Sequence, residues 1–295
     1  MNAPDMSSHS VSHSVSHSVS HSVSHPVGHG ASRDSVSVDA ANPAPLLEAH
    51  GLTLKRGTRT LLAQLDWQAR GGELWCLLGP NGVGKTTLLH ALAGVLPADG
   101  VQLNGRALGQ WDMQQLALER GFMPQQIHDA FSASALDTVL LGRHPHLGRW
   151  DWESDADVAI ARQALNDCGM AAFAQRDVVT LSGGERQRVG LAMLLAQQPR
   201  VLLLDEPVSH QDLQHQVAIF KLLRALADGG HVLVAAVHDI NLAARFATHA
   251  LLLDGAGGSE AGTVDQMLTP ERLTRIFHHP VRRIDDQGRA WFIAE

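Results

Sequence analysis

The chain has 295 residues, 44% of them hydrophobic, and a formal net charge of −7, enough to bury the core of one large or two small domains. No apolar run approaches the roughly 18 residues that cross a bilayer and no secretory signal is recognisable, so we expect a cytoplasmic chain. Its two cysteines, Cys76 and Cys168, exclude a disulfide framework, and the acidic balance without a basic block predicts no nucleic-acid partner.

Residues 1–45 are dominated by Ser, His, Val, Ala and Pro, and histidines recur every four residues. Such a segment has too little apolar mass to offset the entropy of ordering it, so we expect a disordered tail. Neutral imidazoles can collect zinc, copper or nickel, and the alternative is a low-complexity repeat without a role. The repeating histidines are His9, His13, His17, His21, His25 and His29.

A folded domain is predicted after this tail. Apolar runs at residues 52–54 and 61–62 flank a turn at 56–58 and favour two early strands. Residues 74–78 form a continuous apolar run, which predicts a strand buried on both faces. Residues 87–96 are predicted to form a helix.

Two further apolar runs, residues 201–204 and 232–237, are typical of central parallel strands covered by helices. In open α/β sheets, ligands bind at the carboxyl ends of the strands. Polar side chains follow both runs directly. We therefore expect these side chains to lie at the same edge of the sheet as the residues that follow strand 74–78. They are Asp205 and Glu206 after the first run, and His238 and Asp239 after the second.

Residues 125–180 differ in sequence pattern from the strand-forming segments. They contain a helical segment at 155–168 with turn-forming residues around it. We interpret them as a helical insert. Near the end of the chain, residues 281–284 and 290–293 flank a turn at 286–288, which predicts a small hairpin. The insert and the hairpin thus interrupt and extend an α/β core.

A glycine-rich loop joins the strand at 74–78 to the helix at 87–96. Its glycines let backbone N–H groups turn toward an anion, Lys85 can reach the outer phosphates of a nucleotide, and the Thr86 hydroxyl suits magnesium. The alternative is a glycine-rich turn without a ligand, which the later motifs disfavour. The predicted phosphate-binding residues are Gly79, Asn81, Gly82, Gly84, Lys85, Thr86 and Thr87.

The residues after strand 201–204 suit phosphoryl transfer, which requires positioning, charge neutralisation and, for hydrolysis, an oriented water. Asp205 would hold magnesium through a water molecule, because this ion prefers oxygen ligands and retains several waters. Glu206 could accept the proton of the attacking water, and the alternative is an ordinary acid at a helix start.

The segment Leu181–Gln187 reads Leu-Ser-Gly-Gly-Glu-Arg-Gln. Ser182 and Glu185 satisfy a capping box and predict a helix N-terminus, which could be a helix start without a ligand. The serine hydroxyl and two glycines also suit a second anion site. Because one chain that binds one nucleotide does not need two such sites, we expect the second to serve a partner's nucleotide.

In this order, these motifs closely resemble those of the nucleotide-binding subunit of ATP-binding cassette (ABC) transporters, over about residues 46–295. The resemblance implies an α/β fold: a P-loop NTPase core with a mixed central sheet, an antiparallel β subdomain and a helical insert. It implies core segments 46–124 and 181–268, the insert at 125–180 and the hairpin extension at 269–295. The matching residues are Gly79–Thr86, Gln125, Leu181–Gln187, Val201–Glu206 and His238.

The resemblance also implies a head-to-tail dimer of two copies that sandwiches two ATP molecules. Ser182 and Gly184 of one subunit would touch the γ-phosphate held by Lys85 of the other, and His238 would contact that phosphate as a switch. Gln125 would contact the magnesium ion or the attacking water and signal to the membrane subunits. The resemblance thus implies catalytic roles for Glu206, His238 and Gln125. It implies magnesium binding by Thr86, Gln125 and Asp205. It also implies nucleotide contacts by Gly183, Gln187 and Asp212.

Two positions depart from the family's pattern. Arg56 stands where members usually offer an aromatic ring to adenine, and the chain has no tyrosine. A guanidinium plane can also stack on a base, so we expect Arg56 to contact the adenine. The loop after Glu206 has Gln211 where leucine is usual, which could alter contacts across the dimer.

Residues 141–146, 280–283 and 291–293 look like those of importers of cobalamin, ferric siderophores and haem. A zinc or other metal importer is the alternative that the histidines suggest. A soluble ABC ATPase acting on DNA or ribosomes is a different class, disfavoured by the single cassette and short insert. The predicted partners are multi-span permease subunits and, indirectly, a periplasmic binding protein, with the chain peripheral on the cytoplasmic face of the inner membrane.

Overall fold

The computed structural model describes residues 44–126, 132–148 and 150–295. The chain divides into two units, residues 1–39 and 40–295, and all described residues belong to the second. The tail predicted to be disordered, with its histidine repeat, lies outside the described residues as far as residue 43. The described residues begin at residue 44.

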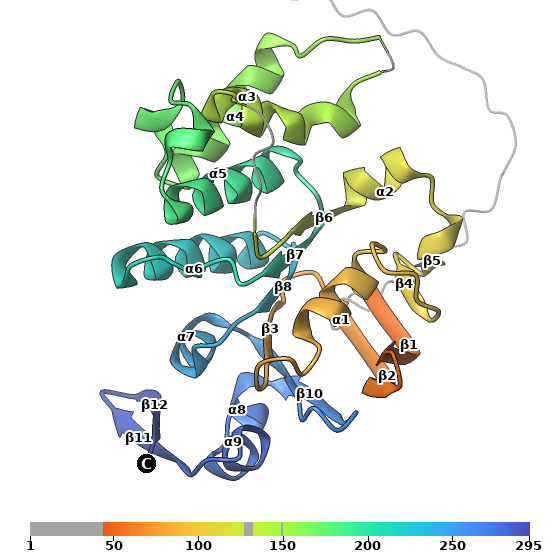
Figure 1. Cartoon of the computed structure of the whole chain (residues 1–295), viewed down its shortest axis with the longest axis vertical. Coiled ribbons are helices and arrows are strands. Elements are labelled where there is room, and N and C mark those ends of the chain that lie inside the picture. Colours follow the sequence, from red (N-terminus) through yellow and green to blue (C-terminus); the bar gives the residue numbers. More distant parts are fainter. Residues whose placement is uncertain (1–43, 127–131, 149) are drawn as a thin grey trace, which may run out of the picture. The chain divides into compact units, whose positions relative to one another are not determined.

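A six-stranded mixed sheet forms the centre of the fold, with strand order β10-β9-β3-β8-β7-β6 (Figure 1). Neighbouring strands from β9 to β6 are parallel, and β10 is antiparallel to β9. The mixed central sheet is therefore confirmed. Its strands are β3 (Leu74–Leu78), β6 (Arg120–Met123), β7 (Val201–Asp205), β8 (Val232–Ala236), β9 (His249–Leu253) and β10 (Ser259–Thr263).

A second sheet is antiparallel, with strand order β2-β1-β4-β5. Its first two strands contain the predicted runs at 52–54 and 61–62 and are joined at Gly57, whose φ of 61° lies in the left-handed region that glycine tolerates. The antiparallel subdomain is thereby confirmed. Its strands are β1 (Pro45–Arg56), β2 (Arg59–Arg70), β4 (Val101–Leu103) and β5 (Arg106–Ala107).

Side chains of the central strands alternate between two hydrophobic clusters. Leu74, Cys76 and Leu78 of β3 pack with residues of α5, α6 and α7, whereas Trp75 and Leu77 pack with α1 and the antiparallel sheet. Each fully buried leucine contributes about 1.5–3 kcal/mol through removal of its surface from water. The helices are α1 (Lys85–Leu92), α2 (Met113–Glu119), α3 (Ala135–Leu140), α4 (Asp155–Asp167), α5 (Gly183–Ala196), α6 (Leu213–Asp228), α7 (Ile240–Phe246), α8 (Val264–Met267) and α9 (Pro270–Phe277).

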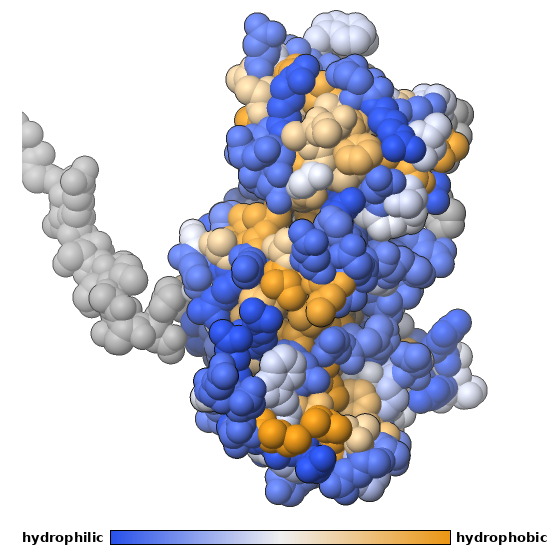
Figure 2. Space-filling model, turned by 90° about the vertical axis from the view of Figure 1, so that its left-hand side faces the viewer, coloured by the Kyte–Doolittle hydropathy of each residue, from blue (hydrophilic) through white to orange (hydrophobic). Residues whose placement is uncertain are grey.

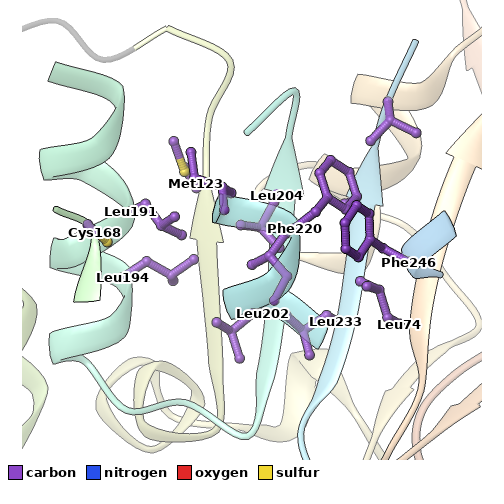
Figure 3. Packing of buried hydrophobic residues seen from close by; sticks show 14 of the residues in the cluster. Leu74, Met123, Cys168, Leu191, Leu194, Leu202, Leu204, Phe220, Leu233 and Phe246 are labelled. Carbon is purple, nitrogen blue, oxygen red and sulfur yellow. The ribbon is translucent and has the colours of Figure 1, made fainter. Parts of the chain in front are cut away.

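The first of these clusters fixes β7, the strand that carries Asp205. Figure 3 shows Leu202 and Leu204 of β7 among side chains from the neighbouring strands and helices, including Leu191 and Phe220. All four of these side chains are at most 1% exposed. Because every residue of β7 is buried, the residues that follow it start from a well-packed strand.

The first helix differs from its prediction at both ends: α1 runs from Lys85 to Leu92 rather than over residues 87–96. It begins earlier because Gly84 closes the loop in a left-handed conformation, with φ 115°. It ends earlier because Gly94 has φ 68°, and the N–H of Val95 then turns back to the carbonyl of His90.

The helix predicted at 155–168 and the C-terminal hairpin are confirmed. α4 coincides with the helix predicted at 155–168 to within one residue, and α3 and α4 both pack on α5. The hairpin consists of β11 (Val281–Asp286) and β12 (Arg289–Ala294), joined at Gln287 and Gly288. Helix α9, which precedes this hairpin, was not predicted.

Within the described residues, no helix combines the length and the apolar character needed to span a membrane. On the face that Figure 2 shows, hydrophobic side chains form separate patches between hydrophilic ones. Large exposed hydrophobic side chains include Leu141 and Trp152 of the insert segment, which are 64% and 87% exposed.

Candidate active site

The loop between β3 and α1 leaves the N-terminus of α1 open to an anion. Gly84, the N-cap of α1, has no side chain to accept from the first N–H groups of the helix, which therefore stay available. At Gly79, a Cβ would collide with the carbonyl oxygen of Leu253, so the loop passes too close to β9 for any other residue. These glycines shape a backbone cradle for phosphate.

Lys85 lies over this cradle and is only 6% exposed. Its Nζ donates hydrogen bonds to the carbonyl oxygens of Gly79 at 2.8 Å and Pro80 at 3.1 Å. Burial lowers the pKa of Lys85, and the nearby carboxylates of Glu206 and Asp205 oppose that shift. The ammonium group is thus already held at the loop that would bind the phosphates.

Asp205 lies at the end of β7 and is 1% exposed. Neither of its carboxylate oxygens has a partner with hydrogen-bond geometry among the described residues. Burial raises the pKa of Asp205; the hydroxyl of Thr86 opposes this shift and the charge of Glu206 adds to it. A buried carboxylate with unsatisfied oxygens beside a hydroxyl fits a divalent cation that accepts oxygen ligands, such as Mg²⁺.

Glu206 follows Asp205 and adopts a left-handed backbone conformation with φ 51°. Its N–H donates to the carbonyl of Ala236 at 3.1 Å, and its Oε1 lies 2.6 Å from the Nε2 of His238. Its side chain is 16% exposed and that of His238 is 47% exposed. Both side chains can therefore reach a ligand at the phosphate loop.

The structure brings most of the predicted first half of the site into one hollow of about 480 Å³. Arg59 and Leu61 also line this hollow, and sequence reasoning missed them because their positions in β2 carry no motif. Arg59 donates from Nη2 to the carbonyl of Gly255 at 3.1 Å. The predicted residues that line it are Arg56, Asn81, Gly82, Gly84, Lys85, Thr86, Thr87, Gln125, Glu206 and His238.

The predicted second anion site lies in a separate hollow of about 420 Å³, which shares no lining residue with the first. The capping box is present at its mouth: the N–H of Glu185 donates to the Ser182 Oγ at 3.3 Å, and that of Ser182 to the Glu185 Oε2 at 2.7 Å. The predicted residues that line this hollow are Ser182, Gly183, Gly184 and Asp212.

Three residues in this second hollow escaped the sequence analysis, namely Arg188, His210 and His215. Arg188 is 8% exposed, and its Nε has no partner among the described residues. The available signal was helical spacing, because Arg188 is four residues after Gly184 and so shares its face of α5. The hollow thus brings a guanidinium and two imidazoles together with the carboxylates of Glu185 and Asp212.

Gln187 does not line either hollow, contrary to its expected place among the nucleotide contacts. Its side chain is 5% exposed and donates from Nε2 to the carbonyl of Glu206 at 2.6 Å and to the Oγ of Ser209 at 3.0 Å. Gln187 is three residues after Gly184, a spacing that leaves the two residues near one face of α5, so its inward direction follows from these hydrogen bonds and not from helical spacing.

Residues 62–209 match the ABC transporter family. The hemin import ATP-binding protein HmuV of Rhodococcus jostii (strain RHA1) is 39% identical over 254 residues, which cover 85% of this chain and 86% of the relative. The structure of a metal-chelate type ABC transporter in an inward-facing conformation is 28% identical, with a TM-score of 0.74, over 85% of this chain and 98% of the other.

A third relative is the ATP-binding cassette MJ0796, solved as a dimer in a post-hydrolysis state bound to ADP and Pi. It is 25% identical, with a TM-score of 0.65, and the match covers 74% of this chain and 99% of the cassette. The fold, the phosphate cradle and these similarities agree. The chain therefore belongs to the ABC transporter family, in which it is an ATP-binding subunit that hydrolyses ATP.

Proposed function

We propose that the chain powers an importer of haem or a related iron chelate, and that it works as a head-to-tail dimer. The main support for the dimer is that the two hollows are separate: Lys85 lines one and Ser182 lines the other. Each ATP would lie between the first hollow of one copy and the second hollow of the other. The dimeric state of the related cassette supports this arrangement.

In the first hollow, Lys85 and the free N–H groups of α1 bind and orient the β- and γ-phosphates. Thr86, Gln125 and, through water, Asp205 would hold Mg²⁺, which neutralises phosphate charge when bound. Arg56 lies at the same hollow, where its guanidinium can stack on the adenine.

Glu206 is placed to accept the proton of the attacking water. As the water oxygen bonds to the γ-phosphorus, the bond from that phosphorus to the β,γ-bridging oxygen breaks, leaving ADP and inorganic phosphate. His238 holds the Glu206 carboxylate by the 2.6 Å contact and faces the same hollow, where it can also contact the γ-phosphate.

The partner copy would supply the second half of the site. Ser182, Gly183 and Gly184 offer a hydroxyl and backbone N–H groups at the N-terminus of α5, and Asp212 lies at the same hollow. The γ-phosphate then interacts with both copies at once. ATP binding would close the dimer, and hydrolysis would open it.

The cargo proposal rests on the relatives. The HmuV protein is named for hemin import, and the similar solved structure is of a metal-chelate type transporter. The permease would dock on the insert, whose exposed Leu141 and Trp152 are typical of protein interfaces. The subunit would then lie on the cytoplasmic face of the inner membrane and receive cargo signals from a periplasmic binding protein through the permease.

This proposal keeps the domain division expected from the sequence. Residues 46–124 and 181–268 would form the ATPase core, residues 125–180 the insert, and residues 269–295 the extension. The extension comprises α9 as well as the hairpin.

Replacing Glu206 by glutamine tests the catalytic part. The E206Q variant should bind ATP, form a stable dimer on gel filtration and lose turnover by about 10²-fold or more, because the general base is absent. A variant that stays monomeric with ATP would contradict the dimer. Full turnover would contradict the role of Glu206.

The cargo is tested in vesicles that contain the copurified permease. A haem-loaded binding protein added on the outer side should stimulate ATP hydrolysis more than the same system supplied with cobalamin or zinc. Stimulation by cobalamin alone would support the cobalamin alternative, and stimulation by zinc alone would support the metal importer. Either result would contradict haem import.

A further inference from the structure

Gln187 connects the helix that begins at Ser182 to the backbone of Glu206. Its side chain is 5% exposed, does not line the second hollow and lies against the segment that follows β7. The Nε2 group donates to the carbonyl oxygen of Glu206 at 2.6 Å and to the Oγ of Ser209 at 3.0 Å. The Ser209 hydroxyl lies 3.1 Å from the Oε1 of Gln187 and can donate to it.

The Glu206 carbonyl has a second donor, the N–H of Ser209 at 3.1 Å. The two bonds fix the direction of this carbonyl, and with it the peptide plane that follows Glu206. This peptide plane requires stabilising contacts, because Glu206 has φ 51°, a conformation that residues with a side chain rarely adopt. A backbone held in such a conformation persists only where its surroundings determine it.

We infer that Gln187 is a positioning residue for hydrolysis, which holds Glu206 in its left-handed conformation and so aims its carboxylate at the attacking water. This inference rests on the proposed role of Glu206 as the general base. It assigns Gln187 no contact with nucleotide, because Gln187 lines neither hollow.

The position of Gln187 also links the two halves of the site within one chain. Gln187 lies in the first turns of α5, whose N-terminus forms the second hollow, and its amide binds the residue that completes the first. A shift of α5 when a partner's nucleotide enters the second hollow would therefore reach Glu206 directly. A second amide strengthens this connection, because the Nε2 of Gln211 donates to the carbonyl of Gly184 at 3.0 Å.

Replacing Gln187 by methionine keeps the length of the side chain and removes its hydrogen bonds to Glu206 and Ser209. For Q187M we expect kcat for ATP hydrolysis to fall about tenfold to a hundredfold, because small displacements of a catalytic group cost this much. The KM and the Kd for ATP should stay within about twofold, since no nucleotide contact is lost. Gln187→Asn, which keeps an amide but is one methylene shorter, is the second variant should Q187M fold poorly.

The matched control is Gln197→Met at the other end of the same helix. The Nε2 of Gln197 also donates to two backbone carbonyls, those of Ala117 and Arg120, but neither residue lines the first hollow. This variant loses a comparable pair of hydrogen bonds and should lower the melting temperature without lowering kcat. Equal loss of kcat in both variants would overturn the inference.

A double-mutant cycle with Glu206→Gln separates positioning from general damage. If Gln187 acts through Glu206, Q187M should cost about tenfold or more in the wild-type background and nothing further in the E206Q background, measured as residual hydrolysis at excess protein. An equal loss in both backgrounds, an increased KM with unchanged kcat, or no change at all would overturn the inference. Full turnover of the E206Q variant would show that Glu206 is not the general base. The positioning role of Gln187, which depends on that base, would then be refuted as well.

Discussion

The Nε2 of His238 lies 2.6 Å from the Oε1 of Glu206, although 32 residues separate them in sequence. They meet because β7 and β8 are parallel neighbours, with Asp205 opposite Ala236, so that the chain leaves both strands at the same edge. The imidazole and the carboxylate therefore line the same hollow side by side.

We expect the His238→Ala variant to lower kcat for ATP hydrolysis about 10²-fold, because it removes a contact to the γ-phosphate and frees the Glu206 carboxylate. The matched control is His50→Ala, which removes a half-exposed imidazole beside Glu48 in β1. Steady-state hydrolysis compares the two variants. Unchanged turnover in H238A would show that the 2.6 Å contact has no part in the reaction.

Asp205→Asn should stabilise the protein and inactivate it. Burial raises the pKa of Asp205 above its ordinary 3.8, so the folded state disfavours the carboxylate and stability falls as pH rises from 3.8 through the folded pKa. At pH 7 without magnesium or nucleotide, the neutral amide should raise the melting temperature by roughly 2–4 °C, corresponding to about 1 kcal/mol.

The stability gain of D205N should shrink as pH falls from the folded pKa and should vanish below 3.8, where the wild-type carboxyl is protonated in the folded and the unfolded state. The variant should also lose magnesium-dependent hydrolysis, because its amide is a poorer ligand than a carboxylate. Thermal melts at several pH values check the first point. A melting temperature below that of wild type at pH 7 would contradict the reading of Asp205 as a buried, unsatisfied anion.

Lys85→Met should weaken ATP binding about 10- to 100-fold, because a charge-assisted hydrogen bond to phosphate is lost. Its melting temperature should change little, since only two bonds to carbonyls of its own loop disappear. Titration with a fluorescent ATP analogue measures the affinity, with the exposed Lys221→Met of α6 as the control. Equal affinities in the two variants would refute the phosphate role.

Asp157→Ala should lower stability by about 3 kcal/mol, because it leaves a buried guanidinium without its carboxylate. Arg143 is 6% exposed, and its Nε donates to the Asp157 Oδ1 at 2.8 Å. The control is Asp228→Ala, which breaks an exposed pair with Arg224 and should cost about 0.5 kcal/mol or less. Urea unfolding measures both changes.

The effect of Asp157 should depend on pH. Hydrogen bonds from Ser154 and from Arg143 lower the pKa of Asp157 below its ordinary 3.8. Its contribution is then fully present above 3.8 and is lost as pH falls through the folded pKa, so the gap between wild type and D157A should narrow below about pH 4. A gap that is constant between pH 7 and pH 3 would show that the pair does not titrate as inferred.

Arg188→Met should leave ATP binding by one chain intact and weaken ATP-dependent dimerisation. Arg188 lines the second hollow, so we expect its guanidinium to contact a partner's phosphate there. Analytical ultracentrifugation in the E206Q background measures the dimer. A dimer as stable as that of E206Q alone would contradict a nucleotide contact from this hollow.

The sequence was sufficient to predict the local chemistry of the chain. The strands at 74–78, 201–204 and 232–237 followed from continuous apolar runs, and the capping box at Ser182 followed from the spacing to Glu185. Both depend on contacts between residues close in sequence or on burial of whole segments, and for that reason they can be read without a structure. Helix ends were less accurate, as α1 shows, because the φ of Gly94 decides where it stops.

Sequence by itself indicated most of the residues that line the two hollows, because each motif is a short segment whose residues stay close together in the fold. Only the tertiary structure decided which residues meet. Sheet order brings His238 to Glu206, and packing of α5 against the segment after β7 turns Gln187 away from both hollows and onto the Glu206 carbonyl. These contacts join distant segments through burial and hydrogen-bond geometry, which no local pattern records.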